Sequence, residues 1–230
     1  MEHRDAMFLA KRLACGWLCG WLCGWTLASG LPAAENPPAV VWRIEGVGNV
    51  GGQLTEVIGA PRVLDRAVVF NGSDDGLLVA KNPLVGLPAF TVEVLFFPAE
   101  NGLPEQRFWH AQDLKGARAL LETRLNGNGG WWLDTYLANG GTAGLPLVDP
   151  RKVHPTNAWY WVALRYDGKT MAHFVDGVKE REGPVEFGPM GEGKLSLGVR
   201  QNRMHWFKGA IREVRVTPAA LAQEALQLVK

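Results

Sequence analysis

The sequence predicts an all-β fold, a sandwich or barrel of about a dozen short antiparallel strands. The clearest indication is the stretch 159–178, in which two aromatic and β-branched segments are each followed by an Asp-Gly pair, Asp167-Gly168 and Asp176-Gly177. Asp-Gly pairs are typical of tight turns, because glycine adopts positive φ at no steric cost and aspartate tolerates it. The second indication is that similar short segments, separated by glycine-rich turns, recur from residue 40 onward.

The individual strands are predicted from apolar and β-branched runs that end at Gly, Asn, Asp or Pro. The strongest is 90–97, whose even-numbered residues are all apolar and share one face, with Glu93 as a lone acid on the other. We expect Glu93 to be paired or solvent-facing. The glycine-rich segment 46–52 lacks the signature of a phosphate-binding loop and predicts a flexible loop. The other predicted strands are 40–44, 66–70, 77–80, 108–112, 119–125, 131–138, 159–166, 171–175, 194–200 and 206–216.

Both ends of the chain differ from this pattern. The tail 218–229 has helical spacing and predicts a short C-terminal helix. At the other end, charged residues up to Lys11-Arg12 precede an apolar run of about 15 residues, and small residues follow. This layout predicts a secretory signal peptide over residues 1–34, with an uncleaved membrane anchor as the alternative. We therefore expect a secreted or periplasmic protein in which residues 35–230 form one domain.

Charge and cysteine content narrow the function classes. All three cysteines lie in the apolar run, in a repeated Cys-Gly-Trp unit, so no disulfide is expected in the mature protein. Without the leader, basic and acidic residues are equal in number, and no basic stripe or polybasic cluster is present. Nucleic acids and anionic membranes are therefore not expected as partners.

Six short motifs follow one another along the chain: VFNG at 69–72, FTVE at 90–93, WVALRYDG at 161–168, FVDG at 174–177, LSLG at 195–198 and FKGAIREVR at 207–215. In this order they resemble the motifs of bacterial laminin-G-like domains of the concanavalin A-like lectin/glucanase superfamily. The resemblance covers residues 40–225 and implies a concanavalin A-like jelly-roll β-sandwich. It implies a broad function, the binding of glycans or proteins with enzymes as a minority, because the motifs mark the fold and not a catalytic site.

Many relatives of this kind bind calcium through acidic loop residues. The sequence contains no dense oxygen-ligand motif. Asp74 and Asp75 are suited to ligate an ion, but they equally suit a turn without one. We therefore expect no cofactor and assign no metal ligand, with calcium as an unsupported alternative.

One face of the predicted hairpin 119–138 is the candidate ligand-binding surface. Sugars suit such a face, because aromatic rings stack on their apolar sides while carboxylates and arginines bind hydroxyl or acidic groups. The alternative is an ordinary solvated sheet face with cross-strand ion pairs. The candidate residues are Glu122, Arg124, Trp132, Asp134 and Tyr136, with His173 and Arg200 expected on the same side.

A second candidate cluster is expected in loops, which gather at the ends of sandwiches where binding sites form. The histidines lack metal-binding spacing, so ordinary hydrogen-bonded histidines are the favoured interpretation. The members of this cluster are Arg107, Trp109, His110, His154, His205 and Trp206.

These observations favour non-catalytic recognition of a glycan or glycoconjugate. Retaining jelly-roll glycosidases take two carboxylates from neighbouring positions of one strand face, and no such acidic run occurs. The fragments 122–124 and 206–208 are similar to parts of jelly-roll alginate lyases. That likeness implies a uronate lyase as the alternative, with Tyr136 or Tyr160 and His110 or His154 as proton carriers. A protein–protein adhesion module is the third possibility, and the oligomeric state is left open.

Overall fold

The computed structural model describes residues 37–141 and 143–229. The chain divides into two units, Met1–Glu35 and Asn36–Lys230, and the second contains the fold. The predicted signal peptide lies outside the described residues and stays a prediction. Within the described part of the chain, no helix reaches the length and apolar character needed to cross a membrane.

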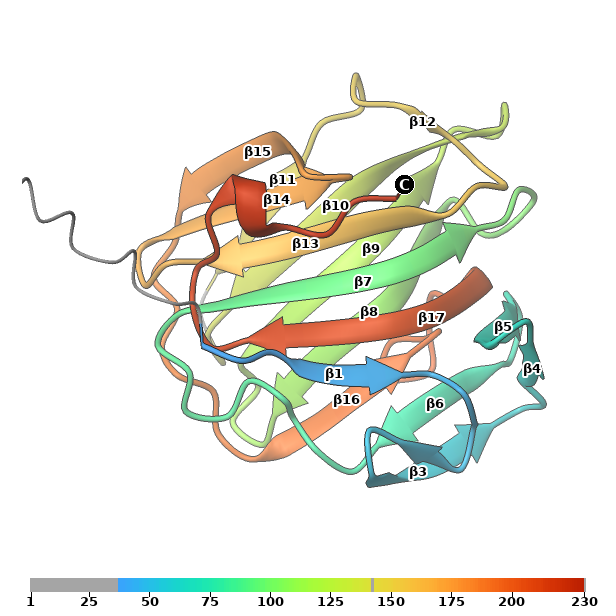
Figure 1. Cartoon of the computed structure of the whole chain (residues 1–230), viewed down its shortest axis with the longest axis horizontal. Helices are drawn as coiled ribbons and strands as arrows, with labels where there is room; N and C mark the ends of the chain where they lie inside the picture. Colours follow the sequence, from blue (N-terminus) through green and yellow to red (C-terminus); the bar gives the residue numbers. More distant parts are fainter. Residues whose placement is uncertain (1–36, 142, 230) are drawn as a thin grey trace, which may run out of the picture. The chain divides into compact units, whose positions relative to one another are not determined.

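Two antiparallel sheets form a sandwich, which confirms the predicted all-β class (Figure 1). The eight-stranded sheet runs in the spatial order β15 (Val178–Pro184), β14 (Thr170–Val175), β13 (Tyr160–Tyr166), β7 (Phe90–Pro98), β17 (Lys208–Thr217), β5 (Ala67–Asn71) and β4 (Arg62–Leu64), with β1 (Val40–Arg43) also paired to β17. The nine-stranded sheet runs in the order β11 (Leu145–Val148), β10 (Gly130–Ala138), β9 (Arg118–Leu125), β8 (Glu105–Asp113), β16 (Gly193–Leu197), β6 (Gly76–Val79), β3 (Gln53–Ile58) and β2 (Asn49–Val50), with β12 (His154–Pro155) also paired to β10.

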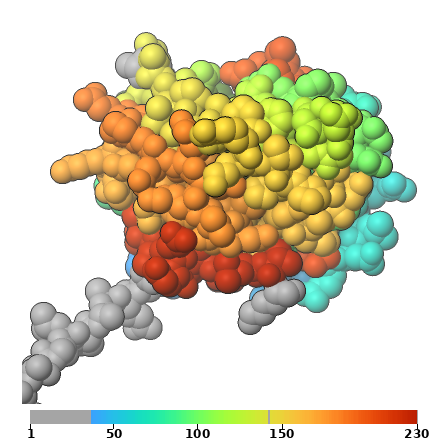
Figure 2. All heavy atoms as spheres, turned by 90° about the horizontal axis from the view of Figure 1, so that it is seen from above, coloured from blue at the N-terminus to red at the C-terminus, as the bar shows by residue number. Residues whose placement is uncertain are grey.

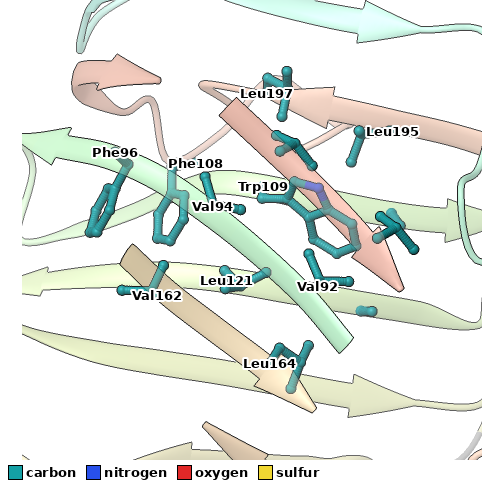
Figure 3. Packing of buried hydrophobic residues seen from close by; sticks show 14 of the residues in the cluster. Val92, Val94, Phe96, Phe108, Trp109, Leu121, Val162, Leu164, Leu195 and Leu197 are labelled. Carbon is teal, nitrogen blue, oxygen red and sulfur yellow. The ribbon is translucent and has the colours of Figure 1, made fainter. Parts of the chain in front are cut away.

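The hydrophobic core lies between the two sheets (Figure 3). The even-numbered residues of β7 point into it, as the alternation predicted, and meet side chains of the facing sheet. The ring of Phe96 stacks on Phe108 with centroids 4.4 Å apart, and Trp131 contacts the same ring edge-on at 5.1 Å. Such aromatic pairs contribute roughly 0.5–1.5 kcal/mol each beyond the area they bury. They join β7 of one sheet to β8 and β10 of the other.

Both predicted Asp-Gly turns are present. The Asp167 carboxylate accepts backbone N–H bonds from Lys169 and Thr170 at 2.9 and 2.7 Å, which closes the turn between β13 and β14. Asp176 and Gly177 have φ angles of 43° and 72° between β14 and β15. Two successive positive φ angles are the geometry of a type I′ turn, whose twist matches that of the strands on either side.

The N-terminal part of the sandwich contains more strand than the sequence indicated. The segment 46–52, expected as a loop, includes the two-residue strand β2. Gly51 and Gly52, with φ angles of 59° and 77°, form its turn into β3. The strands β3 and β4 were not predicted, because several of their apolar side chains are exposed and the alternation is irregular.

The C-terminal tail covers part of the outer face of the eight-stranded sheet. The expected short helix is a single three-residue 3-10 turn, η1 (Gln223–Ala225), and the rest of the tail has no regular secondary structure. Leu221 and Leu226 are buried, while Leu228 of the expected apolar stripe is exposed. The two leucines pack on Ala163, Ala172 and Phe174 of β13 and β14. The tail, red in Figure 2, runs along one side of the molecule.

Hydrogen bonds fix the tail to β7. The Thr91 hydroxyl donates to the carbonyl of Ala219 at 2.8 Å and accepts the N–H of Leu221 at 2.9 Å. The N–H of Gln227 donates to Glu93 Oε1 at 2.7 Å. Glu93 is therefore a paired and buried carboxyl. Burial raises its pKa, although the Gln227 N–H and the Arg215 charge act in the opposite direction.

Candidate functional site

The hairpin β9–β10 brings the predicted acidic, basic and aromatic residues to one face. Glu122 lies directly opposite Asp134, and Arg124 lies opposite Trp132. Side chains two residues apart on a strand share a face, so Tyr136 joins this set. The intervening residues of both strands are apolar or threonine and face the core. These polar side chains therefore lie on the outer face of the nine-stranded sheet.

A hollow of about 220 Å³ opens on this face. It lies over three neighbouring strands, β8, β9 and β10, and is completed by Pro146 of β11 and by Arg200 from the loop after β16. The hollow is smaller than the pockets that enclose a drug-sized ligand. Its size therefore suits one monomer unit of a polymeric ligand. Its lining consists of Arg107, Arg118, Leu120, Glu122, Arg124, Asp134, Tyr136, Pro146 and Arg200.

An ion-pair network forms the floor of the hollow. Arg107 Nε bonds Glu122 Oε1 at 2.8 Å, and its Nη1 pairs with Glu105. Arg124 bonds Asp134 Oδ2 through Nε at 2.9 Å and Nη2 at 2.7 Å, and its Nη1 pairs with Glu105 at 2.6 Å. Charge-assisted bonds of this kind are stronger and more directional than neutral ones. The network therefore holds these five side chains in fixed positions before any ligand arrives.

Burial sets the ionisation of the two facing carboxyls. It raises the pKa of Glu122 to about 7, with Arg107 acting in the opposite direction and Asp134 in the same one. It also raises the pKa of Asp134, against the hydrogen bond from Arg124. Perturbed carboxyls in a hollow mark a candidate functional site, although structural ion pairs produce similar shifts.

Arg118 and Arg200 differ from the arginines of the network. Neither makes an ion pair or side-chain hydrogen bond within residues 37–141 and 143–229. The Arg118 guanidinium lies over the ring of Tyr136, with its Cζ 5.2 Å from the centroid. Burial lowers the pKa of Arg200, and the neighbouring charges of Arg118 and Arg107 lower it further. The hollow thus presents two guanidinium groups without a carboxylate partner.

Of the first predicted set, His173 does not lie at this site. It is fully buried on β14, between the sheets, where its Nδ1 is 2.9 Å from the hydroxyl of Thr135. Burial lowers its pKa to about 3, so it is neutral at physiological pH. Its expected place on the binding face was wrong, because it shares its strand face with Met171 and Val175, which are core residues. Trp132 lies on the outer face but does not line the hollow.

The second predicted cluster was placed in loops, which is right for His205 and Trp206 and wrong for its other four members. Arg107, Trp109 and His110 lie on β8, next to the hairpin. Trp109 is fully buried in the core. His110 is also buried, and its Nδ1 accepts the N–H of Gln201 at 3.2 Å, which ties the loop that carries Arg200 to β8. Burial and the charges of Arg200, Arg118 and Arg107 lower the pKa of His110 to about 3.

The other members of that cluster separate. His205, in the loop before β17, approaches Glu105 with Nδ1 3.9 Å from Oε1 and therefore borders the network. Trp206, half-buried in the same loop, does not line the hollow. His154 lies elsewhere, on β12, with its Nε2 2.8 Å from Glu180 Oε1 and its ring 5.7 Å from that of Tyr160. Tyr136 therefore forms no proton-transfer pair in the hollow with His110 or with His154, because neither histidine lines it.

Sequence reasoning missed Glu105 and Arg118. The strand β8 was expected to begin at 108, which left Glu105 in a loop, and β9 was expected to begin at 119. A signal for Arg118 was present, because it continues the alternation of Leu120 and Glu122 toward the strand's start.

A second hollow, of about 450 Å³, lies on the outer face of the eight-stranded sheet. Its lining is mainly apolar and includes Leu64, Val69, Phe97 and Trp159. Arg212 covers the Trp159 ring with its Cζ 4.2 Å from the centroid. This hollow has no carboxylate network comparable with the first one among the described residues.

Asp74 and Asp75, whose sequence context suits either an ion or a turn, have hydrogen-bond partners within the chain. Asp75 accepts the N–H groups of Ala60 and Asn71 at 2.8 and 3.0 Å, and Asp74 accepts the side-chain amide of Asn71. Nowhere in residues 37–141 and 143–229 do three His, Cys, Asp or Glu side chains gather closely enough to hold a metal ion. The expectation about calcium stays untested.

Comparison with known proteins assigns the fold to a family. Residues 71–227 match the Laminin_G_3 family model, described as the concanavalin A-like lectin/glucanases superfamily. The chain belongs to this family. The resemblance inferred from the motifs is thereby confirmed. No curated protein matches the sequence.

Solved structures show the same fold at low sequence identity. Domain 4 of an extracellular GH43 arabinanase from Geobacillus stearothermophilus, solved with arabinotriose, has a TM-score of 0.61 and 19% identity over 83% of this chain and 97% of that domain. The binding domain of paraclostridial mosquitocidal protein 1 has a TM-score of 0.61 and 12% identity over 81% of this chain and 50% of that one. A heptameric pentraxin from Limulus polyphemus has a TM-score of 0.55 and 15% identity over 68% of this chain and 77% of its own. This chain therefore spans about half of the toxin domain but nearly all of the arabinanase domain.

Proposed function

We propose that this protein is a secreted, non-catalytic glycan-binding domain whose ligand lies in the hollow on the outer face of β8, β9 and β10. The observation that carries the proposal is the pre-organised network of Arg107, Glu122, Arg124 and Asp134 beneath an open hollow bordered by Tyr136. Sugars are bound by such mixed donors and acceptors next to aromatic side chains. A network fixed before binding loses little conformational entropy when the ligand arrives.

Structural neighbours support a carbohydrate as the ligand. The arabinanase domain was solved with arabinotriose, and nearly its whole length corresponds to this chain. The binding domain of botulinum neurotoxin DC was solved with a sialylated ligand, SialylT, at 11% identity and a TM-score of 0.59, but this chain spans only 49% of it. The arabinanase domain is the stronger support, because the matched region there includes almost all of the domain that was solved with the sugar.

The proposal is tested by affinity electrophoresis of residues 35–230 against a panel of neutral and acidic polysaccharides. We expect retention by at least one member, and we expect Tyr136→Ala, which removes a half-buried aromatic ring from the lining of the hollow, to weaken it several-fold. Trp159→Ala is the matched control, because Trp159 is also half-buried but lies on the outer face of the other sheet. Retention lost equally in both variants, or absent across a broad panel, would reject this site.

A polysaccharide-degrading enzyme is the second candidate, and the pKa of about 7 for Glu122 favours it. A carboxyl that is half protonated near neutral pH is suited to general acid catalysis, and Asp134 faces it across the strands. However, Glu122 and Asp134 are both engaged by arginines, which hold them away from a proton-transfer role. Release of reducing ends or of unsaturated products, abolished in Glu122→Gln, would establish the enzyme instead of the binding domain.

A further inference from the structure

We infer that the hollow recognises the anionic group of an acidic sugar, a carboxylate or a sulfate ester, through Arg118 and Arg200. This inference rests on the proposed function and specifies its ligand. It starts from the charges that line the hollow. Arg107 and Arg124 are neutralised by Glu105, Glu122 and Asp134, whereas Arg118 and Arg200 have no acidic partner among the described residues.

Each carboxyl of the site already has an arginine partner, whereas Arg118 and Arg200 are donors without an acidic partner among the described residues. Glu105, Glu122 and Asp134 each accept a bond or ion pair from Arg107 or Arg124. A guanidinium carries five N–H donors and no acceptor, so the two unpaired and partly exposed arginines have donors available for the acceptors of a ligand. Carboxylates and sulfate-like oxyanions match the planar fork of arginine better than neutral hydroxyls do.

The two arginines are held in place by contacts that do not neutralise their charge. Arg118 rests on the Tyr136 ring, and cation–π contact leaves its N–H edges free to donate. The loop that carries Arg200 is tied to β8 through the bond from Gln201 N–H to buried His110. The like charges of Arg200, Arg118 and Arg107 act on one another in a half-buried hollow, so an anion placed among them relieves their repulsion.

Charge alone does not select this hollow, since other arginines of the chain also lie at the surface. Arg151 pairs with Asp149 at 2.8 Å, and Arg203 pairs with Glu56 at 3.0 Å. Both are more exposed than the arginines of the hollow, with side-chain exposures of 83% and 61%. They therefore provide a matched control in which the same charge is removed from outside the site.

The test is isothermal titration of residues 35–230 with trigalacturonate, its methyl-esterified form and sulfated and unsulfated dextran oligosaccharides. We expect at least one acidic member to bind, and its neutral counterpart to bind roughly ten- to hundredfold more weakly, as for loss of a charge-assisted bond. The double variant Arg118→Gln/Arg200→Gln should lose the same factor. The control Arg151→Gln/Arg203→Gln should bind like the wild type.

The outcomes separate the inference from the proposed function. Equal binding of the acidic saccharide and its neutral counterpart overturns the inference but leaves glycan binding intact. A preference for the acidic saccharide that survives in Arg118→Gln/Arg200→Gln has the same meaning. Loss of binding in the control pair as well means that only the net charge matters, which also overturns it. No binding of any saccharide, here or in the polysaccharide panel, removes the proposed function itself. Binding of trigalacturonate alone assigns a carboxylate, and binding of sulfated dextran alone assigns a sulfate.

Discussion

The outer faces of the two sheets each carry a buried glutamate, and the two glutamates have different roles. On the eight-stranded sheet, Glu93 is covered by the C-terminal tail and accepts the N–H of Gln227. On the nine-stranded sheet, Glu122 is bound by Arg107 at the floor of an open hollow. Burial raises the pKa of both carboxyls. A raised pKa therefore does not distinguish a site from a structural contact, whereas the group that covers the carboxyl does.

The covering groups differ in where they come from. The tail reaches Glu93 from the far end of the chain and seals it with backbone and apolar side chains. The neighbours of Glu122 come from adjacent strands and leave the surface above it open to solvent. One face is thus closed by the chain itself, and the other is left for a ligand. The following changes test this difference, beginning with the largest expected effect.

The replacement Arg107→Leu should destabilise the protein most. It removes the partner of a nearly buried carboxylate, and breaking a buried ion pair from one side costs about 3 to 5 kcal/mol. Urea unfolding at pH 8, where Glu122 is mainly ionised, measures the loss. The exposed pair Arg203–Glu56 supplies the control, and Arg203→Leu should cost about 0 to 1 kcal/mol. Similar losses in both variants would mean that the network is not buried as described.

The pH dependence of stability should change in Glu122→Gln. Between the ordinary pKa of 4.5 and the folded value of about 7, the folded state keeps a proton that the unfolded state has released. Ionisation of Glu122 therefore lowers the free energy of unfolding as the pH rises through this window, by about 3 kcal/mol in total. The Glu122→Gln variant lacks this pH-dependent contribution to the free energy of unfolding, because its side chain does not ionise.

The free energy of unfolding of Glu122→Gln minus that of the wild type should accordingly increase by about 3 kcal/mol from pH 4 to pH 8. Taking this difference cancels the opposite contributions of His110 and His173, whose lowered pKa values destabilise the fold as the pH falls below 6.5. A difference that is constant across the range would show that Glu122 titrates normally.

The covered face is tested by Leu226→Ala. Leu226 is 6% exposed and packs on the outer face of β13 and β14, so its truncation should cost about 2 kcal/mol, the lower end for buried leucine. Leu228, which is 54% exposed in the same tail, is the matched control, and Leu228→Ala should change stability by less than about 0.5 kcal/mol. Equal stabilities of the two variants in urea would show that the tail does not close this face.

Strand alternation was enough to predict the face of the hairpin that carries Glu122 and Asp134, because regular strands obey a period of two. It failed at β8, where the register shifts between Arg107 and Trp109. This bulge leaves Phe108 and Trp109 both in the core and turns Arg107 outward, so Arg107 and Trp109 lie on opposite faces although they are two positions apart.

The contacts that complete each face come from distant parts of the chain, and local patterns do not encode them. The bond from Gln227 to Glu93 spans 134 residues, and the one from Gln201 to His110 spans 91. His173 is the opposite case, since its strand face with Met171 and Val175 already indicated the core. Its polarity suggested exposure, but inside the sandwich its Nδ1 is hydrogen-bonded to the hydroxyl of Thr135, while its Nε2 is buried without a hydrogen-bond partner among the described residues.

The smallest expected effect is that of Glu93→Gln, which makes the same chemical change as Glu122→Gln on the other face. The amide oxygen still accepts the N–H of Gln227, so the free energy of unfolding at pH 7 should change by less than about 1 kcal/mol. Glycan affinity should stay within twofold of the wild type, because the tail separates Glu93 from solvent, whereas Glu122→Gln alters the charge balance of the hollow. Calorimetric titration of both variants with the same saccharide measures the two affinities. A loss of affinity in Glu93→Gln that matches the loss in Glu122→Gln would contradict the assignment of only one face to the ligand.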